Sequence, residues 1–235
     1  QMEQLAQKIE KRLKGNEGKD SAIAVSLLFS YLNPDHELRL KEFLQSQFPK
    51  VAVSISHELA PIWREYERGS TVVADAFVKP LLQRYVSSVR KSLDSLGLRC
   101  PWAIMKSNGG HTTAEGAESQ PVNLLLSGQS GGIIGGKYFG ALAREKNLVT
   151  LDMGGTSCDV GVVQGGKLSY ITNYEVEWGI PVSAPFVDLT TIGAGGGSIA
   201  WIDKGGFLRV GPQSAGAEPG AICYDRGGTE VTVTD

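Results

Sequence analysis

The amino-acid sequence predicts an α/β fold, because segments with helical spacing alternate with short apolar runs that are typical of buried strands. Hydrophobic residues make up 41% of the 235 residues, which is enough for one large or two small domains with a core. The chain also has 30 glycines, a share well above the average of about 7%, and most of them follow Ser107. Glycine at this density indicates tight turns or backbone that lies close to a ligand.

The first half of the chain alternates between helices and strands. Apolar residues recur at helical spacing in three segments, which are expected to be helices: residues 4–14, 35–48 and 71–96. Three compact apolar runs are expected to be buried strands: residues 22–28, 51–55 and 102–105. Pro80 lies inside the longest helical segment, where a proline removes a backbone donor. It is therefore expected to kink that helix or to mark a boundary.

The second half is expected to contain more strands and turns. A helix is predicted at residues 133–144. Strands are predicted at residues 148–153, 159–163 and 167–171, the last two as a hairpin around Gly165 and Gly166. Glycine-dense loops follow.

The change in composition near Ser107 predicts a boundary between residues 1–106 and residues 107–235. The chain begins within a helical pattern and ends on the strand-like residues 231–235 without a cap. Both ends are therefore expected to be cuts in a longer protein.

Charge and cysteine content exclude several classes of protein. The formal net charge is −2 with mixed signs, which gives no reason to expect nucleic acid or an anionic membrane as a partner. No apolar run reaches the roughly 18 residues of a membrane span, and no signal peptide is visible. Cys100, Cys158 and Cys223 form no Cys-x-x-Cys pair, so they are interpreted as reduced thiols in a cytoplasmic protein.

The most informative motif is residues 151–159, where a strand delivers Asp152 into the turn Gly154-Gly155-Thr156. Consecutive backbone N–H groups in such a turn form a concavity that suits phosphate oxygens. Asp152 would then act on Mg²⁺, which prefers one or two carboxylates together with phosphates and waters. A tight hairpin turn with a surface aspartate explains the same spacing equally well.

Two neighbouring patterns imitate nucleotide-binding motifs. Residues 161–167 have the spacing of a P-loop, but Leu168 stands where Ser or Thr is needed for Mg²⁺. Residues 193–198 begin as a dinucleotide fingerprint but end on Ser198, without a clear βαβ unit around them. Both patterns are rejected.

The segment Gly128-Gln129-Ser130-Gly131-Gly132 matches the nucleophile elbow of serine hydrolases. In that fold the histidine follows the serine, whereas all three histidines here precede Ser130, and none has metal-ligand spacing. Close helix packing, or anion contact at a helix N-terminus, is the favoured interpretation.

Several stretches together resemble the hydantoinase A / 5-oxoprolinase family. The resemblance covers about residues 50 to 235, and its motifs occur in the family's order: residues 64–68, 105–110, 151–160, 191–201, 210–217 and 232–235. It implies part of an actin/Hsp70-like (ribonuclease H-like) ATPase fold with mixed sheets and flanking helices. Residues 1–106 would complete the N-terminal lobe, and residues 107–235 would carry the second of two phosphate-binding hairpins.

The resemblance also implies a reaction. It is the ATP-driven opening of a cyclic amide, such as a hydantoin, N-methylhydantoin or 5-oxoproline, through phosphorylation of the amide oxygen. Phosphoryl transfer depends mainly on positioning and charge neutralisation. The family's first hairpin would precede Gln1 and its adenosine-binding segment would follow Asp235, so this chain alone is expected to be inactive.

The resemblance to this family also implies which residues form the site. Asp152 and Asp159 are the expected catalytic residues, and Asp152 is the expected Mg²⁺ ligand. The ATP-binding residues are expected to be Gly154, Gly155, Thr156, Ser157, Gly195, Gly196 and Gly197. The expected partners are a hydantoinase B-type second subunit and a possible second copy of the chain.

Two other functions remain open: a subunit of an ATP-dependent ketone carboxylase, and a non-catalytic nucleotide-binding module. The sequence also departs from the family's pattern. Gln129 replaces a usual proline, Cys158 a threonine, Ala221-Ile222 a Pro-Ala pair, and Asp225 a glycine. These departures leave the charged residues in place, but they do not identify the substrate.

Overall fold

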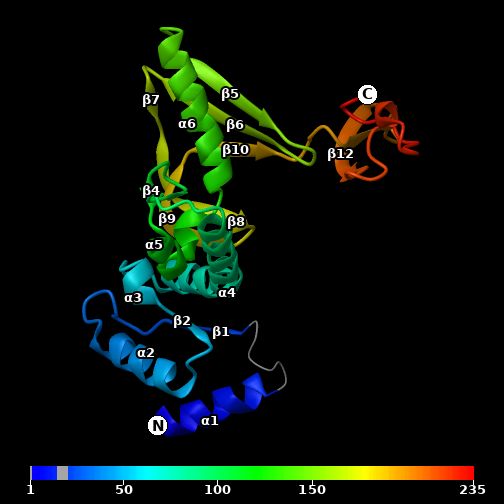
Figure 1. The fold of residues 1–235 in the computed structure, drawn as a ribbon. Helices are drawn as coiled ribbons and strands as arrows, with labels where there is room; N and C mark the ends of the chain where they lie inside the picture. The colour runs from blue at the N-terminus through cyan, green and yellow to red at the C-terminus, as the bar shows by residue number, and fades with distance from the viewer. Residues whose placement is uncertain (1, 15–20) are drawn as a thin grey trace. The chain divides into compact units, whose positions relative to one another are not determined.

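A computed structural model describes residues 2–14 and 21–235 (Figure 1). The chain divides into two compact units, Gln1–Ser127 with Tyr170–Phe186, and Gly128–Ser169 with Val187–Asp235. These units follow from contacts, whereas the boundary at residues 106/107 rests on composition and stays a prediction. Helices and strands alternate as expected, so the α/β class is confirmed.

The first unit begins with two layers. Its early elements are α1 (Met2–Leu13), β1 (Ala22–Val25), α2 (Asp35–Gln47), β2 (Ala52–Ile55) and α3 (Ser56–Leu59). Strands β1 and β2 pair in parallel, from Ala22 opposite Ala52 to Val25 opposite Ile55. A small core of Val25, Leu44, Val53 and Ile55 holds α2 against them. The predicted strand 22–28 is shorter than expected because the chain turns after Val25.

Helix α4 (Glu65–Ser95) begins six residues before the predicted start and continues through Pro80. Its inner face carries buried polar residues, including Thr71, Asp75 and Lys79, which hide the apolar pattern of a buried helix. Asp75 accepts hydrogen bonds from the Ser54 hydroxyl at 2.6 Å and from Lys79 Nζ at 3.3 Å. These bonds satisfy the buried charges, which is the condition for keeping them inside a protein.

The remainder of the first unit consists of short elements and one hairpin. These are β3 (Ile104–Met105), β4 (His111–Thr112), α5 (Ala114–Ser119), the 3-10 helix η1 (Pro121–Leu124), β8 (Tyr170–Glu177) and β9 (Ile180–Val187). Strands β8 and β9 pair with each other, and Val182, Ala184 and Phe186 pack against Val122. The predicted strand 102–105 shrinks to two residues.

The second unit carries a small sheet and two further strands. Its elements are α6 (Ser127–Leu142), β5 (Leu148–Met153), β6 (Cys158–Gln164), β7 (Lys167–Leu168), β10 (Leu189–Ile192), β11 (Ser198–Ile202), β12 (Leu208–Ser214) and the 3-10 helix η2 (Ile222–Tyr224). The sheet has the order β10-β6-β5, with β7 on β6. The β6–β7 hairpin turns at Gly165 and Gly166 as predicted, with φ of +59° and +74°.

Helix α6 lies along β5 through a row of glycines (Figure 1). A Cβ atom added to Gly136 would lie 2.3 Å from Thr150 Cγ2, and one added to Gly140 would lie 2.2 Å from Leu148 Cδ2. The spacing of four residues on the helix matches two residues on the strand, since both are about 6 Å. The glycines therefore allow the helix to approach the sheet.

Two further observations concern the ends and the surface. The strand-like pattern of residues 231–235 does not form a strand: this segment forms a single bridge, Ile199 with Thr232, followed by a turn. The Asp235 carboxylate accepts the Thr232 N–H at 2.8 Å, which bends the chain into that turn. No helix within residues 2–14 and 21–235 is both long enough and apolar enough to span a membrane.

Candidate functional site

The β5–β6 turn is the centre of the candidate site. Strand β5 ends at Met153, and the Gly154 N–H donates to the Ser157 carbonyl at 2.9 Å to close the turn. Within the described part of the chain, the N–H groups of Gly155 and Thr156 donate no hydrogen bond. The turn therefore offers the consecutive donors that the sequence predicts for binding an anion.

A second glycine segment lies against this turn. The Gly196 N–H donates to the Gly154 carbonyl at 2.9 Å, and the Gly197 N–H donates to the Gly155 carbonyl at 2.7 Å. A Cβ atom on Gly195 would lie 2.6 Å from the Thr156 nitrogen. Residues 195–197 must therefore be free of side chains for the two segments to meet.

A third segment comes from the end of the chain. The Thr234 N–H and hydroxyl both donate to the Gly196 carbonyl, at 3.0 and 2.8 Å. From the other side, the Ala215 N–H donates to the Gly197 carbonyl at 2.8 Å. Segments about 40 and 80 residues apart in the sequence thus meet at one point.

These segments enclose a pocket of about 710 Å³ in the second unit, which we call the glycine pocket. Its lining residues are Met153, Gly154, Gly155, Thr156, Gly196, Gly197, Ser214, Gly216, Ala217, Ala221, Tyr224, Arg226 and Thr234. Five of the seven predicted ATP-binding residues are among them. Ser157 and Gly195 do not line it but support the turn from behind.

The two predicted catalytic aspartates lie at the ends of β5 and β6, directly opposite each other in the strand register. Asp159 is buried and accepts the Thr191 hydroxyl at 2.6 Å. Asp152 is exposed and its carboxylate lies beside Gly132 of α6, outside the lining of the glycine pocket. Both roles stay predictions.

Metal binding has limited support from side chains alone. Among residues 2–14 and 21–235, no three His, Cys, Asp or Glu side chains form a group that could hold a metal ion. Mg²⁺ does not require such a group, because it is commonly held by one or two carboxylates together with phosphates and water. Asp152 and Asp159 are the carboxylates nearest in sequence to the turn.

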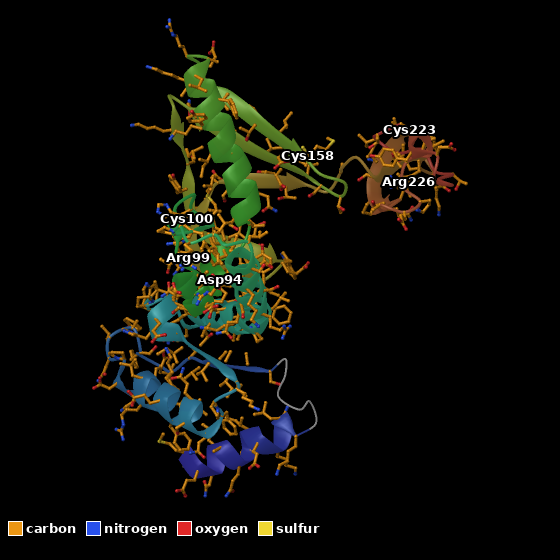
Figure 2. The ribbon with its side chains drawn as sticks, in the orientation of Figure 1. Asp94, Arg99, Cys100, Cys158, Cys223 and Arg226 are labelled. Atoms are coloured by element: carbon orange, nitrogen blue, oxygen red, sulfur yellow. The ribbon has the colours of Figure 1, made fainter. Side chains whose placement is uncertain are left out.

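Asp235 organises the C-terminal part of the site. Its carboxylate accepts the N–H groups of Cys223 at 2.8 Å and of Thr232 at 2.8 Å. These bonds hold the pKa of Asp235 well below its usual value. The pKa of the neighbouring Cys223 thiol is raised, first by burial and then by the Asp235 carboxylate. Cys223 and Arg226 lie in the same C-terminal segment (Figure 2).

The rejected motifs have structural roles. Ser130 is buried within α6 rather than exposed on a strand-to-helix turn, so residues 128–132 are not a nucleophile elbow. Residues 161–168 form the β6–β7 hairpin instead of a P-loop, and residues 193–198 lead into strand β11 rather than into a helix.

A sequence profile of the hydantoinase/oxoprolinase family matches residues 68–235. The chain belongs to this family. The resemblance of its motifs is thereby confirmed, and the glycine pocket lies within the matched region.

Several members of the hydantoinase/oxoprolinase family are similar over 91% of this chain. They are the caprolactamase subunit alpha of Pseudomonas jessenii (37% identical), the acetophenone carboxylase gamma subunit of Aromatoleum aromaticum (36%) and the 5-oxoprolinase of Saccharomyces cerevisiae (36%). The chain spans only 31%, 30% and 16% of these relatives, respectively.

Two solved structures share the fold of this family member. The ATP-dependent caprolactamase from Pseudomonas jessenii matches 99% of the chain with a TM-score of 0.78 and 34% identity. A nucleotide-free acetone carboxylase matches 98% with a TM-score of 0.77 and 26% identity. The chain covers 33% and 32% of those two structures. The expected partial fold of an ATP-dependent enzyme is therefore confirmed.

Proposed function

We propose that this chain is part of an ATP-dependent hydrolase that opens a cyclic amide such as a hydantoin, N-methylhydantoin or 5-oxoproline. The observation that most strongly supports this proposal is the glycine pocket. In it, three separate segments meet at the β5–β6 turn, where two backbone N–H groups donate no hydrogen bond to a described residue. The family and its relatives named caprolactamase and 5-oxoprolinase support the reaction class.

The residues present fit the phosphates of ATP. Gly155 and Thr156 line the glycine pocket, and their backbone N–H groups donate no hydrogen bond to a described residue. Hydroxyl groups of Thr156, Ser214 and Thr234 line the same space. ATP would supply a phosphoryl group that turns the amide oxygen into a good leaving group. The chain's own residues would hold and orient the phosphates, which is most of what phosphoryl transfer requires.

Asp152 is the proposed Mg²⁺-binding carboxylate, and Asp159 is proposed to act beside it by holding β6 in position. Their opposed positions place two oxygen donors at the base of the turn. The Asp152 carboxylate is exposed and forms no side-chain hydrogen bond with a described residue, so it can bind a metal ion or a metal-bound water directly. Asp159 would hold the end of β6 in position through its hydrogen bond with the Thr191 hydroxyl of β10.

A ketone carboxylase subunit is the second candidate. The acetophenone carboxylase gamma subunit is 36% identical, nearly as similar as the caprolactamase subunit, and acetone carboxylase has nearly the same structural similarity. The two solved relatives are both named as ATP-dependent, so the phosphate-binding part of the site would be the same. The substrate-binding part would differ.

A second subunit is proposed for either reaction, because two of these relatives are themselves named as subunits. We expect it to be of the hydantoinase B type. A cytoplasmic location is proposed because Cys100, Cys158 and Cys223 are all free thiols.

The test is substrate-dependent phosphate release by the full-length protein, with and without its second subunit, and by its Asp152→Ala variant. Release stimulated by 5-oxoproline or a hydantoin, and lost in the variant, supports the cyclic amidase. Release that depends on a ketone and bicarbonate supports the carboxylase instead. Binding of Mg-ATP without turnover of either substrate would contradict both and favour a nucleotide-binding module.

A further inference from the structure

Arg226 is the only charged side chain among the residues that line the glycine pocket. It forms no ion pair with any residue in the described ranges. The other lining residues with a polar side chain carry hydroxyl groups: Thr156, Ser214, Tyr224 and Thr234. A pocket with one guanidinium, several donors and no carboxylate side chain is suited to an anion.

The Arg226 guanidinium is exposed and lies near one aromatic ring. Its carbon lies over the Tyr224 ring, 5.9 Å from the ring centroid. The Tyr224 ring in turn packs on Gly220, where a Cβ atom would lie 3.0 Å from Tyr224 Cδ2. Stacking on an aromatic face leaves the N–H edges of an arginine available for hydrogen bonds.

The backbone around Arg226 is fixed on both sides. Asp225 has a left-handed conformation with φ of +54°, and its N–H donates to the Ile222 carbonyl at 3.0 Å, which turns the chain after η2. The Asp235 carboxylate accepts the Cys223 N–H and so ties this loop to the chain's last turn. Gly228 lies against the same loop, since a Cβ atom there would be 2.5 Å from the Gly220 carbonyl.

We propose that Arg226 binds a phosphate group in the glycine pocket. The planar guanidinium can donate two parallel hydrogen bonds to phosphate oxygens, and the N–H groups of Gly155 and Thr156 can donate to the same group from the β5–β6 turn. This assignment deepens the proposed function and rests on it. No sequence motif marked Arg226, because its place in the pocket depends on the folding of residues 220–235 against the turn.

The phosphate could belong to a bound nucleotide, or it could be the free phosphate that the reaction releases. Both sources present the same tetrahedral, doubly charged oxygens. They differ in whether a nucleoside contributes to binding.

The experiment measures, by isothermal titration calorimetry, the Kd of the full-length protein for inorganic phosphate, ADP and adenosine. The variants are Arg226→Met and Arg226→Lys. The first removes the positive charge; the second keeps the charge but removes the planar guanidinium that can donate two parallel hydrogen bonds. Arg144→Met is the matched control, because it removes an arginine of the same unit that does not line the pocket.

We expect Arg226→Met to weaken the binding of ADP by about tenfold to a hundredfold, the range for a hydrogen bond to a charged group. Arg226→Lys should weaken it less, and adenosine binding and the Arg144→Met control should be unchanged. A parallel loss for inorganic phosphate assigns free phosphate to the same position. A loss for ADP alone assigns the nucleotide's phosphate.

Unchanged affinities for both phosphate and ADP in Arg226→Met would overturn the assignment, as would a wild-type protein that binds neither. A failure of the proposed reaction can be distinguished from a failure of this assignment. A protein whose phosphate or ADP binding depends on Arg226, but which hydrolyses no cyclic amide, keeps this assignment and refutes the cyclic amidase.

Discussion

Asp152 and Asp159 lie opposite each other in the β5–β6 register, but their carboxylates have different surroundings. Asp159 is 8% exposed and accepts the Thr191 hydroxyl at 2.6 Å, which connects β6 to β10. The Asp152 carboxylate is exposed beside Gly132 and accepts no hydrogen bond from a described residue. One carboxylate is therefore committed to holding the sheet, and the other is available to a ligand.

We expect Asp159→Ala and Asp152→Ala to separate these roles. Asp159→Ala should destabilise the sheet by about 1.5–3 kcal/mol, because it removes a hydrogen bond to a buried carboxyl group. Asp152→Ala should change stability by less than about 0.5 kcal/mol, as exposed substitutions usually do, while abolishing substrate-dependent phosphate release. Amide hydrogen exchange of β6 in the full-length protein measures the first effect. Equal exchange in the two variants would contradict the division of roles.

The glycines of α6 give a second prediction. Gly136→Ala places a methyl group 2.3 Å from the stiff Thr150 side chain and should destabilise the protein by about 1–3 kcal/mol through overpacking. Gly135→Ala is the matched control, because no atom lies within 4 Å of its Cβ position. The control should stabilise the helix by about 0.5–1 kcal/mol, the usual gain of alanine over glycine. If the melting temperatures of Gly136→Ala and Gly135→Ala shifted in the same direction, the proposed contact between α6 and β5 would be contradicted.

These glycines also explain why the sequence predicted α6 only in part. The predicted helix began at Ile133, but the structure begins it at Ser127, because residues 127–132 contain no apolar residue to mark a helical face. Strand β9 was missed for a related reason. Pro181 and Pro185 interrupt its alternating pattern, and proline is normally a signal against a strand.

The site was predictable where one segment carried its chemistry. The β5–β6 turn and residues 195–197 each have a local glycine signal, and both contribute to the pocket. Thr234 has no such signal, because it reaches the pocket through its hydrogen bond to Gly196, which is distant in the sequence. Arg226 has none either, because the loop that carries it is tied to the chain's last turn through Asp235. Long-range contacts of this kind cannot be read from spacing.

Asp225 gives a third prediction. The sequence resemblance implies a glycine at this position, and the backbone conformation agrees: φ is +54°, a left-handed conformation that glycine adopts without cost. Asp225→Gly should therefore stabilise the protein by up to about 1 kcal/mol. Asp225→Ala should destabilise it, because alanine lacks the short polar side chain that helps aspartate adopt this conformation. A higher melting temperature for Asp225→Ala than for Asp225→Gly would contradict backbone strain at residue 225.

Residues 193 and 195 give a fourth prediction about the pocket itself. A methyl group on Gly195 would lie 2.6 Å from backbone atoms of Thr156, so Gly195→Ala should displace the β5–β6 turn and weaken ADP binding at least tenfold. Gly193→Ala is the control in the same loop, since nothing lies within 4 Å of its Cβ position. Equal ADP affinities for the two variants, measured by calorimetry, would argue against contact between this loop and the phosphate-binding turn.

The hydrogen bonds to Asp235 give a fifth prediction, which concerns pH. Two backbone N–H groups lower the pKa of this carboxyl in the folded protein, and its pKa in an unfolded chain is about 3.9. A lowered pKa means that the charged form stabilises the fold above the unfolded value, and that this contribution disappears as the pH falls through the folded value. Asp235→Asn keeps only one acceptor oxygen, so it should lower the melting temperature at neutral pH.

The difference in melting temperature between wild type and Asp235→Asn should be constant from about pH 5 to 8, and should shrink as the pH falls below about 4. Asp188→Asn is the control, because this exposed carboxylate accepts no hydrogen bond from a described residue, and its difference should stay small throughout. A difference for Asp235→Asn that grows in acid would show that protonated Asp235 is the stabilising form. The loop that carries Tyr224 and Arg226 would then be held by something other than the charged carboxylate.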